Sequence, residues 1–406
     1  MPLLRDRRIA ALLAAEVISS TGTQMTWLAL PWFVYRNTNS PQRMTWVIIA
    51  EVLPVAVLGF WGGAIAGRLG TRRTMLTCDL ARVPLFAAIP ALHAAGALPF
   101  PALLALVAVS GVFLAPYFSV TRAVIPELVG EEQADVAQAA ALFQAANRTT
   151  IFIGPPLAGV LISLLGTANV IYVDAATYLA SFLLVATFVR LPEVVTEGAP
   201  TGVLDGVRFM ARDKLLRLWT PAFTVIDICW MLLFASLPVL VVSSYHANIR
   251  ILGWLFGAMG GGSLVGAFVS MFVVRKVEAL TLGAAAFTLE MASLWILAVP
   301  APWEIAFTGM ALAGFFTSLV NTPVHALITL RIPREIRTQA LASFGVFQCI
   351  GSPIGLVLAG WALARYDTHS VLAVVLAVDT VAAATFVAAA LVERSSLRAA
   401  LVDSPA

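Results

Sequence analysis

Long apolar runs recur along the whole chain, and they constrain its fold more than any other feature of the sequence. A helix needs about 20 mostly apolar residues to cross the hydrocarbon core of a bilayer. Twelve such runs lie near residues 9–35, 44–66, 74–95, 101–121, 136–165, 170–189, 218–243, 251–274, 279–299, 303–330, 338–364 and 370–391. The chain is only 12% charged, whereas soluble domains are about 25% charged. The sequence therefore predicts an all-α membrane protein with twelve transmembrane helices.

Most connections between these runs are very short, and only one is long. Segment 190–217 holds Pro192, Pro200 and the charged stretch 205–214, and we interpret it as a linker that includes a short surface helix. This linker divides the runs into two sets of six. The predicted organisation is an N-terminal six-helix bundle over residues 1–190, a cytoplasmic linker over 191–217, a C-terminal six-helix bundle over 218–394 and a cytoplasmic tail over 395–406.

The 25 lysines and arginines gather in alternate connections. The other connections hold only Arg36, Arg43, Arg250 and Arg365. Because cytoplasmic loops retain Lys and Arg, this asymmetry predicts that both termini are cytoplasmic. We expect a multi-pass protein that has the lipid bilayer of a bacterial inner membrane as its partner. The net charge of +3 gives no indication of a nucleic-acid partner.

A glycine ladder followed by a basic turn lies between the second and third runs. Gly59, Gly63 and Gly67 are four residues apart, so they share one helix face and allow another helix to approach closely. Gly70 permits a sharp turn. The basic residues of the short cytoplasmic loop are Arg68, Arg72 and Arg73.

Part of this pattern recurs in the second half of the chain at a constant offset. Gly59, Gly63, Gly67, Arg72 and Arg73 correspond to Gly262, Gly266, Ser270, Arg275 and Lys276. Repeats of this kind are typical of membrane proteins that are built from two related halves. We therefore expect the two sets of six helices to be pseudo-symmetric.

The same loop resembles the signature of a known family. A Gly-x-x-x-Asp-Arg-x-Gly-Arg-Arg pattern between spans 2 and 3 is typical of the major facilitator superfamily. The matching residues here are Gly63, Arg68, Gly70, Arg72 and Arg73. The acidic position is occupied by Gly67, and in the family that carboxylate helps to latch the inner gate. The resemblance implies a gating role for the matching residues and a latch that is weaker or built differently here.

Three spans resemble one branch of that family. Span 1 contains Glu16–Gly22 followed by Ala29–Val34, span 4 ends with Ala123–Val129, and span 5 carries Gly154–Gly159. These segments are similar to the drug:proton antiporter branch that includes macrolide-efflux and enterobactin-exporter-like proteins. Thr150 replaces the upstream glycine of the span 5 motif. The resemblance implies the major facilitator fold, with two pseudo-symmetric six-helix bundles, and we expect a monomer.

Sequence motifs of enzymes are not found in the chain. It has no His-Glu-x-x-His, Walker loop or Gly-x-Ser-x-Gly pattern, so we expect no catalytic residues, no cofactor and no nucleotide-driven transport. Cys78, Cys229 and Cys349 lie in apolar runs without metal-ligand spacing, and we interpret them as small core residues rather than as a metal site. An ion gradient, most simply of protons, is the expected source of energy.

Two carboxylates fall inside apolar runs at similar depth. Glu16 and Asp227 lie roughly 10–14 Å from the cytoplasmic ends of spans 1 and 7, which occupy equivalent places in the two halves. A charge that faced lipid would be costly, so both are expected to face a cavity. There a carboxylate can bind and release protons, and we predict proton coupling for both residues. The alternative is a structural carboxylate bound to a neighbouring Arg or Ser.

The two arginines inside apolar runs suggest different roles. Arg148 lies in the same span as Pro155, and a buried guanidinium needs a carboxylate or an anionic substrate. It belongs either to a substrate or proton network or to a structural ion pair. Asp79 and Arg82 are three residues apart at the inner end of span 3, and we interpret them as gate residues that touch each other and the basic loop.

Three more acidic residues lie in apolar runs. Asp174 is near the start of span 6, where capping or interfacial solvation is expected. Glu290 and Asp379 fall in the middle of spans 9 and 12, and the sequence assigns them no role.

Glycine and proline also interrupt spans 5 and 11, at Gly154, Pro155 and Pro156 and at Gly351, Pro353 and Gly355. Gly154 and Pro155 break span 5, where freed backbone carbonyls suit a gate and plain packing is the alternative. Gly253, Gly257 and Gly261 form a ladder at the outer end of span 8. This ladder is a candidate outer-gate contact with span 5.

Polar and aromatic residues on the spans expected to line a cavity predict where a substrate binds. The candidates are Ser20, Thr23, Trp27, Phe113, Tyr117, Arg148, Met231, Phe234, Phe316 and Gln348. An apolar cavity with few polar anchors suits amphipathic small molecules better than sugars, although core packing is the alternative for each aromatic residue. The predicted function is proton-coupled export of a hydrophobic or amphipathic drug, antibiotic or siderophore by alternating access. The alternatives are an ion-coupled symporter that imports a metabolite and a non-transporting membrane receptor.

Overall fold

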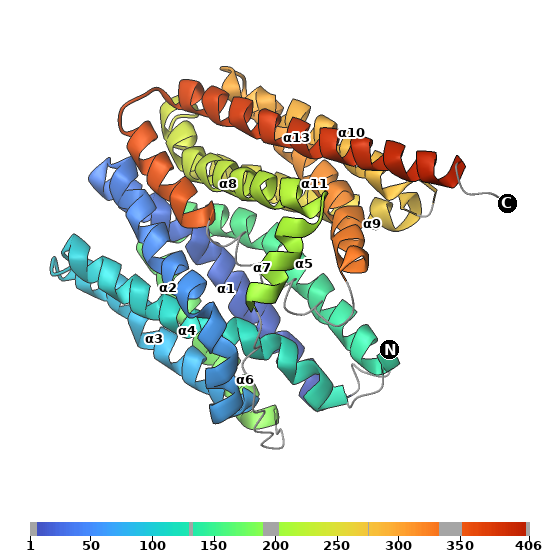
Figure 1. Ribbon diagram of the computed structural model, residues 1–406. Coiled ribbons are helices and arrows are strands. Elements are labelled where there is room, and N and C mark those ends of the chain that lie inside the picture. Colours follow the sequence, from blue (N-terminus) through green and yellow to red (C-terminus); the bar gives the residue numbers. More distant parts are fainter. Residues whose placement is uncertain (1–5, 130–132, 190–202, 275, 333–350, 403–406) are drawn as a thin grey trace. The chain divides into compact units, whose positions relative to one another are not determined.

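The computed structural model describes residues 6–129, 133–189, 203–274, 276–332 and 351–402 of the chain (Figure 1). All regular structure in these ranges is helical, as the sequence predicts. The helices are α1 (Arg7–Thr38), α2 (Pro41–Leu69), α3 (Thr71–Ala94), α4 (Phe100–Val129), α5 (Gln133–Leu165), α6 (Thr167–Phe188), α7 (Val203–Arg212), α8 (Leu216–Ser244), α9 (Ile249–Val273), α10 (Ala279–Leu294), η2 (Trp295–Ala298), α11 (Trp303–Arg331) and α13 (Thr368–Val402). A further helix, Gly351–Leu363, lies between α11 and α13 in the chain.

Ten of the described helices are long and apolar enough to cross a membrane. They are α2 to α6, α8, α9, α10 with η2, α11 and α13. α1 has 32 residues but does not meet the same criterion of length and apolar composition, and Gly351–Leu363 is a shorter apolar helix. The structure thus supports ten of the twelve predicted spans by length and composition, and the other two stay a prediction.

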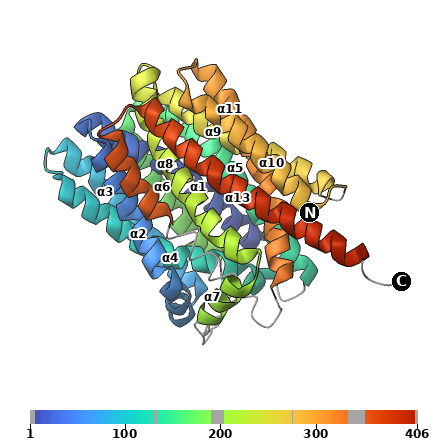
Figure 2. The ribbon, with the colours of Figure 1, turned by 45° about the horizontal axis from the view of Figure 1, so that its top comes forward.

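The chain divides into two compact units, which we describe separately. The first comprises Met1–Ala199 with Ile249–Gly257, and the second comprises Pro200–Asn248 with Ala258–Ala406. In the first unit α2 packs along α4, α1 packs on α5 and α6, and α3 packs on α4 and α6. Figures 1 and 2 both show α2, α3 and α4 side by side.

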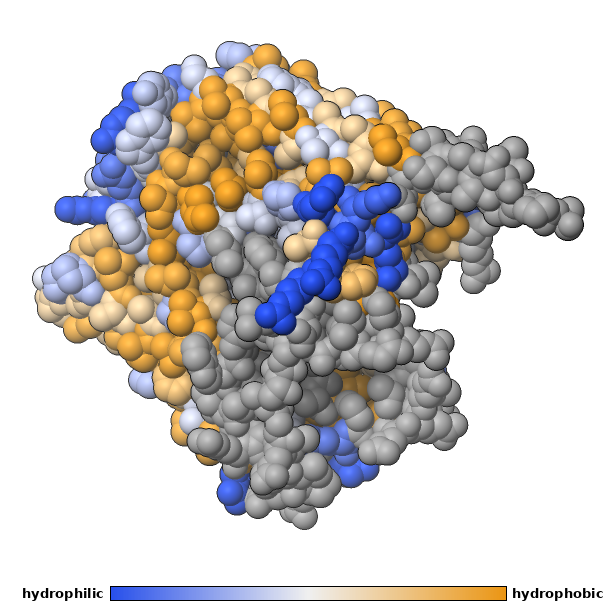
Figure 3. Space-filling model, in the orientation of Figure 1, coloured by the Kyte–Doolittle hydropathy of each residue, from blue (hydrophilic) through white to orange (hydrophobic). Residues whose placement is uncertain are grey.

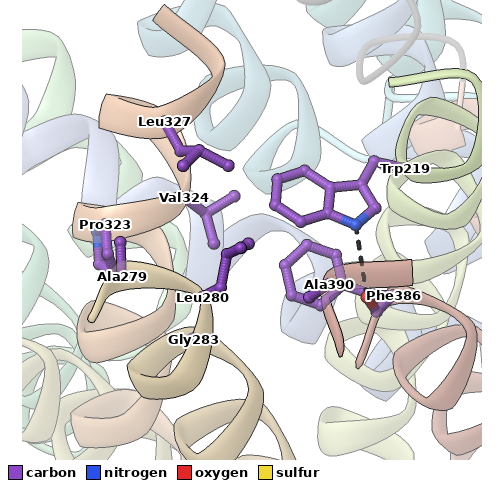
Figure 4. A pocket seen from close by; sticks show the side chains of 9 residues that line it. All are labelled: Trp219, Ala279, Leu280, Gly283, Pro323, Val324, Leu327, Phe386 and Ala390. Carbon is purple, nitrogen blue, oxygen red and sulfur yellow. Dashed lines mark hydrogen bonds between the residues drawn. The ribbon is translucent and has the colours of Figure 1, made fainter. Parts of the chain in front are cut away.

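In the second unit α8 packs along α13, and α10 packs along α11 and α13. A narrow apolar pocket lies where these four helices meet (Figure 4). Trp219 Nε1 donates a 3.3 Å hydrogen bond to the carbonyl oxygen of Phe386, and the two rings stack with their centroids 4.3 Å apart. The other residues that line the pocket are Ala279, Leu280, Gly283, Pro323, Val324, Leu327 and Ala390.

Glycines let helices in each unit touch backbone to backbone. A β-carbon added at Gly111 of α4 would lie 3.3 Å from the carbonyl carbon of Glu51 on α2. One added at Gly314 of α11 would lie 2.8 Å from the carbonyl carbon of Met259 on α9. Gly111 and Gly314 are as far apart in the sequence as Gly59 and Gly262 of the repeat. The repeat therefore coincides with equivalent helix contacts in the two units.

The second glycine ladder of the repeat also packs closely, as its spacing predicts. β-Carbons at Gly262 and Gly266 of α9 would lie 2.8 Å and 2.9 Å from the carbonyl carbons of Ala311 and Phe315 on α11. Such spacing suits packing in a membrane, where close van der Waals contact replaces the hydrophobic effect. The first ladder belongs to residues 59–68 of α2, whose side chains lie outside the described part of the structure.

The molecular surface carries many large apolar side chains. Leu164, Phe268 and Val381 are 67%, 60% and 68% exposed. Figure 3 shows broad areas of hydrophobic residues on the face that it presents. Soluble monomers rarely expose apolar patches of this extent. The surface is therefore that of a protein whose helices face lipid.

α1 begins with a capped first turn. Asp6 Oδ1 accepts a 2.8 Å hydrogen bond from the backbone N–H of Arg8, and Asp6 Oδ2 lies 2.9 Å from the Arg8 guanidinium. The hydrogen bonds from Arg8 favour the charged carboxylate and hold the pKa of Asp6 below its ordinary value. The capped turn fixes the start of α1, the helix that carries the predicted site residue Glu16.

Candidate functional site

Glu16 on α1 is the centre of a small hydrogen-bonded group in the first unit. Ser20, one turn further along α1, donates to Glu16 Oε1 at 3.1 Å, and Tyr117 of α4 donates to Oε2 at 3.0 Å. Glu16 is half-buried and forms no ion pair with a basic residue in the described ranges. Sequence reasoning gave these three residues separate roles in proton coupling and substrate binding, and the structure places them in direct contact.

Thr23 continues this group from α1 toward α6. Its hydroxyl lies 2.9 Å from the hydroxyl of Tyr178, which also accepts a hydrogen bond from the guanidinium of Arg82 on α3. The same guanidinium lies over the Tyr178 ring, 3.9 Å from its centroid. Thr23 is thus connected through one tyrosine to a buried arginine.

Asp79 and Arg82 do not form the predicted ion contact with each other in the described ranges, and their gating role stays a prediction. Both are fully buried toward the middle of α3 rather than at its inner end, and no ion pair joins them. Ser181 of α6 donates to Asp79 Oδ2 at 2.7 Å, while Arg82 binds Tyr178. The reason is that this face of α3 packs against α6, which supplies a separate polar partner for each charge.

Asp174 and Glu51 lie near Arg82 and interact with it electrostatically. Asp174 of α6 is 0% exposed, so the predicted interfacial solvation is wrong. The Asp174 side chain can pack against α1 because residue 22 is a glycine. A β-carbon at Gly22 would overlap Asp174 and Thr177. Glu51 of α2 is 5% exposed and was not predicted as a site residue. Its signal in the sequence is a lone acidic residue within an apolar run.

Asp227 on α8 contacts the helix Gly351–Leu363 of the second unit. Ser352 donates to Asp227 Oδ2 at 2.8 Å, and a β-carbon at Gly351 would lie 2.8 Å from the same oxygen. Asp227 is half-buried and has no ion pair among the residues described. Like Glu16, it has a hydroxyl as its hydrogen-bond donor.

The remaining substrate candidates of the first unit differ in burial. Phe113 is half-buried against the apolar core that contains Tyr117, and Trp27 is 38% exposed. Arg148 on α5 is exposed rather than buried, so the expected burial is wrong. The structural ion pair considered for Arg148 is not found in the part of the chain that the structure describes.

The described substrate candidates of the second unit, Met231, Phe234 and Phe316, are half-buried. Met231 packs beside Gly355, where a β-carbon would lie 3.0 Å from its Cβ. The Phe234 ring lies 5.3 Å from the ring of Trp230 on the same helix, and Phe316 is half-buried on α11. Gln348 lies outside the described residues.

The basic turn of the family signature ties α3 to α6. Gly70 has a φ of +80° directly before α3, which is the sharp turn that the sequence predicts. Arg72 Nε donates to the carbonyl of Val189 at 2.5 Å, and Nη2 donates to that of Ala186 at 2.9 Å. A cation at a helix C-terminus is stabilising, so Arg72 fixes the end of α6. Arg73 is exposed.

Two other members of the signature are not fully described. Gly63 and Arg68 fall in α2, within the stretch whose side chains lie outside the described part. Their gating role stays a prediction.

α5 runs without a break through Gly154 and Pro155. Their gating role stays a prediction. The tight contact at Gly154 is with α1, where an added β-carbon would lie 2.5 Å from Cβ of Gln24. α5 contacts the first turns of α9 through Pro155 and Gly159. A β-carbon at Gly253 would lie 2.6 Å from the carbonyl oxygen of Pro155 and 3.2 Å from Cα of Gly159.

Glu290 and Asp379 form a buried acidic pair in the second unit. Each is 2% exposed, and they interact electrostatically. Thr317 of α11 donates to Glu290 Oε1 at 2.8 Å, whereas Asp379 Oδ1 has no hydrogen-bond partner. No described basic residue forms an ion pair with either of them.

Comparison with known proteins decides the family. The profile of the Major Facilitator Superfamily matches residues 12–289 and 220–405. The chain belongs to the major facilitator superfamily. It is a multi-pass membrane transporter with a small-molecule substrate, and the resemblance carried by the basic turn is confirmed.

Several relatives of this superfamily member are named efflux pumps. It is 26% identical over 370 residues to the multidrug efflux pump Tap of Mycolicibacterium fortuitum, covering 86% of this chain and 87% of the relative. It is 22% identical to the Tap pump of Mycobacterium tuberculosis strain H37Rv, covering 86% and 85%. The uncharacterized transporter YvqJ of Bacillus subtilis is 23% identical, covering 91% and 89%. The chain is therefore efflux-like in sequence.

Solved transporters share the superfamily fold with this chain. A mutant of the nucleoside transporter NupG matches with a TM-score of 0.77 at 13% identity, covering 94% of this chain and 99% of that one. A bacterial homologue of the iron transporter ferroportin, in an inward-facing state, matches with a TM-score of 0.73 at 14% identity, covering 96% and 99%. At these identities the likeness concerns the fold alone.

An apolar groove of about 360 Å³ lies in the second unit of this superfamily member, between α8, α13 and the helix Gly351–Leu363. None of the predicted substrate residues lines it. Leu358, Trp361 and Val374 in its wall are 43%, 47% and 65% exposed, so it opens to the side of the unit. Among the described residues there is no group of three or more His, Cys, Asp and Glu that could hold a metal ion.

Proposed function

We propose that this transporter exports hydrophobic or amphipathic small molecules, such as a drug, antibiotic or siderophore, in exchange for protons. Transport proceeds by alternating access, in which two six-helix bundles over residues 1–190 and 218–394 open in turn to the two sides of the membrane. α1 and the predicted span 338–364, of which the structure describes the helix Gly351–Leu363, supply the two spans beyond the ten that length and composition support. The protein acts as a monomer with both termini in the cytoplasm.

The observation that carries this proposal is the environment of Glu16. Two neutral hydroxyl groups, of Ser20 and Tyr117, donate to its two oxygens, and no described cation neutralises it. Neutral donors orient a carboxylate inside a membrane but leave its charge uncompensated. A proton or a cationic group of the substrate can supply the missing charge. Competition of the two for one carboxylate gives antiport.

Asp227 is the equivalent proton site of the second unit in this proposal. It also has a hydroxyl donor, Ser352, and no ion pair in the described ranges. Gly351 brings the backbone of the following helix against the carboxylate, with 2.8 Å between a β-carbon at that position and Oδ2. Loss or gain of a proton at Asp227 therefore acts directly on the packing of α8 against that helix.

Close helix contacts supply the gates. Gly154 sits against α1, and Gly253 sits against the backbone of α5 at Pro155. Helices that touch backbone to backbone can separate and close again without repacking long side chains. Arg72, bound to the end of α6, holds the cytoplasmic side of the first unit. The substrate meets the aromatic and polar candidates that the sequence places on α1, α4, α8 and α11.

The substrate class follows from the relatives and from composition. The Tap relatives are named multidrug efflux pumps, and this chain is 10% aromatic with few intramembrane polar anchors. Apolar and aromatic walls bind amphipathic organic ions better than strongly hydrated sugars.

Transport in proteoliposomes tests the proposal. Purified protein is placed in vesicles with an acidic lumen, and uptake of ethidium and of tetraphenylphosphonium is measured. Antiport predicts that each probe accumulates in the lumen as protons leave, and that nigericin abolishes the accumulation. Probe movement in the direction of proton flow would support the importing symporter instead. No uptake of either probe, with intact protein, would contradict the proposed substrate class.

A further inference from the structure

Four buried charged residues in the first unit have no part in the steps described so far. They are Glu51 on α2, Asp79 and Arg82 on α3, and Asp174 on α6, and we call them the Arg82 cluster. Their side chains are 5%, 0%, 1% and 0% exposed. Three carboxyl groups thus share one guanidinium. With all four ionised, the cluster would carry a net negative charge that burial in a membrane protein disfavours.

Arg82 interacts electrostatically with all three acids of the cluster but forms no ion pair with any one of them in the described ranges. Its guanidinium instead donates to the Tyr178 hydroxyl, and its Nε atom is buried without a hydrogen-bond partner. The cation is therefore available to a carboxylate that gains a negative charge.

Two of the carboxyl groups each keep one oxygen without a donor. Asp79 Oδ2 accepts from Ser181 at 2.7 Å, and Asp174 Oδ1 accepts from Thr177 at 3.2 Å. Asp79 Oδ1 and Asp174 Oδ2 are buried and have no partner. A bound proton removes the charge of such a group. Two protons on the three carboxyl groups leave one carboxylate to balance Arg82.

Two consecutive residues of α1 connect this helix to the cluster, one directly and one through Tyr178. Thr23 Oγ1 lies 2.9 Å from the Tyr178 hydroxyl that Arg82 binds. Gly22 lies directly against Asp174, since a β-carbon there would overlap the Asp174 carboxyl. The helix that carries Glu16 therefore contacts one acid of the cluster directly and reaches its cation through Tyr178.

Titratable groups of the neighbouring helices also face the cluster. Glu16 of α1 and Tyr117 of α4 interact electrostatically with Asp79, as does Cys78 of α3 itself. Arg82 is the only basic residue of the described ranges that interacts with the three acids. Asp79 is therefore the member of the Arg82 cluster that also interacts with Glu16 and Tyr117.

We propose that the Arg82 cluster is a second proton-binding site of the first unit, and that Tyr178 passes its protonation state to Thr23 on α1. The inference rests on the proposed proton-coupled function. When the carboxyl groups lose protons, Arg82 is drawn to the new carboxylates and away from Tyr178. The hydrogen bond between Tyr178 and Thr23 then loses its polarising partner, and α1 is released from α6.

Infrared difference spectroscopy of the purified protein tests proton binding without any substrate. Difference spectra between near-neutral and alkaline pH should show carboxylic-acid C=O bands that shift in D₂O, because surface carboxyl groups are ionised at both and give no band. Glu51→Gln, Asp79→Asn and Asp174→Asn should each remove part of this signal. Glu304→Gln, an exposed residue at the start of α11, is the matched control and should leave it intact. Wild-type spectra without such bands, or with bands that all three variants retain, would overturn the proposal.

Transport measurements test the connection to α1. Tyr178→Phe keeps the aromatic ring over which Arg82 lies but removes the hydroxyl. It should retain the carboxylic-acid bands and counterflow of ethidium, yet lose accumulation driven by a pH gradient. Normal accumulation by Tyr178→Phe would show that Tyr178 does not pass the signal. A wild-type protein that shows the bands but no exchange of probe for protons would refute the proposed function and leave the proton site standing.

Discussion

The hydroxyl of Tyr117 on α4 donates a 3.0 Å hydrogen bond to Oε2 of Glu16 on α1. The two residues are 101 positions apart in the chain, so only the packing of α1 near α4 brings them together. Tyr117 is 4% exposed, which fixes its ring within the core of the first unit. The direction in which Glu16 points is therefore set by a rigid neighbour. Any change in the charge of Glu16 acts on the contact between these two helices.

Replacing Glu16 by Gln should abolish proton coupling while keeping the shape of the site. The amide oxygen can still accept a hydrogen bond from one of the two hydroxyls, of Ser20 or Tyr117, and the amide NH₂ can donate to the other hydroxyl. The amide cannot take up a proton at physiological pH. We expect Glu16→Gln to lose ethidium accumulation driven by a pH gradient and to retain counterflow. Asp227→Asn should behave in the same way if it is the carrier in the second unit. Both are measured in proteoliposomes.

Glu304→Gln is the control for these variants, because it removes an exposed carboxylate from the first turn of α11. If Glu16→Gln, Asp227→Asn and the double variant all concentrate the probe at wild-type rates, neither residue couples protons. If Glu16→Gln instead weakens only the binding of cationic probes, Glu16 is a recognition charge.

The contact of Gly154 with α1 should be essential for movement. A β-carbon there would lie 2.5 Å from Cβ of Gln24, and overpacking of this kind costs about 1–3 kcal/mol. We expect Gly154→Leu to abolish transport in protein that still folds, and Gly154→Ala to slow it. Gly283→Ala in α10 is the matched control, because its β-carbon would meet only Val324, at an ordinary 3.4 Å. Equal transport by the two alanine variants would remove the proposed gating role of Gly154.

Both termini and the linker should lie on one side of the membrane. Single cysteines at Arg73, Ala199 and Arg394 should react with an impermeant maleimide only after the cells are opened. Cysteines at Gly96 and Ala301 should react in intact cells. The expected result follows from the distribution of Lys and Arg among the connections. Labelling of Ala199→Cys in intact cells would contradict the arrangement of two six-helix bundles.

Asp213 should stabilise the start of α8 in two separable ways. Its Oδ1 accepts from the backbone N–H groups of Leu215 and Leu216 at 3.0 Å each, and its Oδ2 lies 2.7 Å from Nε of Arg331. Asp213→Ala removes both and should cost about 1–2 kcal/mol, mostly from the lost cap. Asp213→Asn keeps an acceptor for the cap and should cost less than about 1 kcal/mol. Thermal unfolding in detergent measures the order, and equal losses would show that the cap contributes nothing.

The buried pair of Glu290 and Asp379 should tolerate neutral replacements. Neither forms an ion pair in the described ranges, so an amide of similar shape removes no attractive charge. Gln at position 290 can still accept the hydrogen bond from Thr317. We expect Glu290→Gln and Asp379→Asn to change the free energy of unfolding by about 1 kcal/mol or less. A much larger loss of thermal stability would indicate that the pair is ionised and bound to a cation.

The sequence by itself determined the class of protein and much of its architecture. Apolar runs of membrane-spanning length leave little choice but helices, because a lipid-exposed backbone must satisfy its own hydrogen bonds. The repeated glycines predicted close helix contacts, and Gly262 and Gly266 confirm them on α11. The positive φ of Gly70 likewise follows from its place in the basic turn. These features depend on neighbours in the chain, which a sequence displays directly.

Only the tertiary structure decided which polar residues meet. Glu51 looked like a lone acid in an apolar run, and Asp174 looked like a residue of the membrane interface, yet both lie buried near Arg82. Conversely, Asp79 and Arg82 are close in sequence but have different partners on α6. Inside a membrane a charge is stabilised by whichever group faces it across the helix interface. That group can lie a hundred residues away, and its identity depends on helix packing that no local pattern encodes.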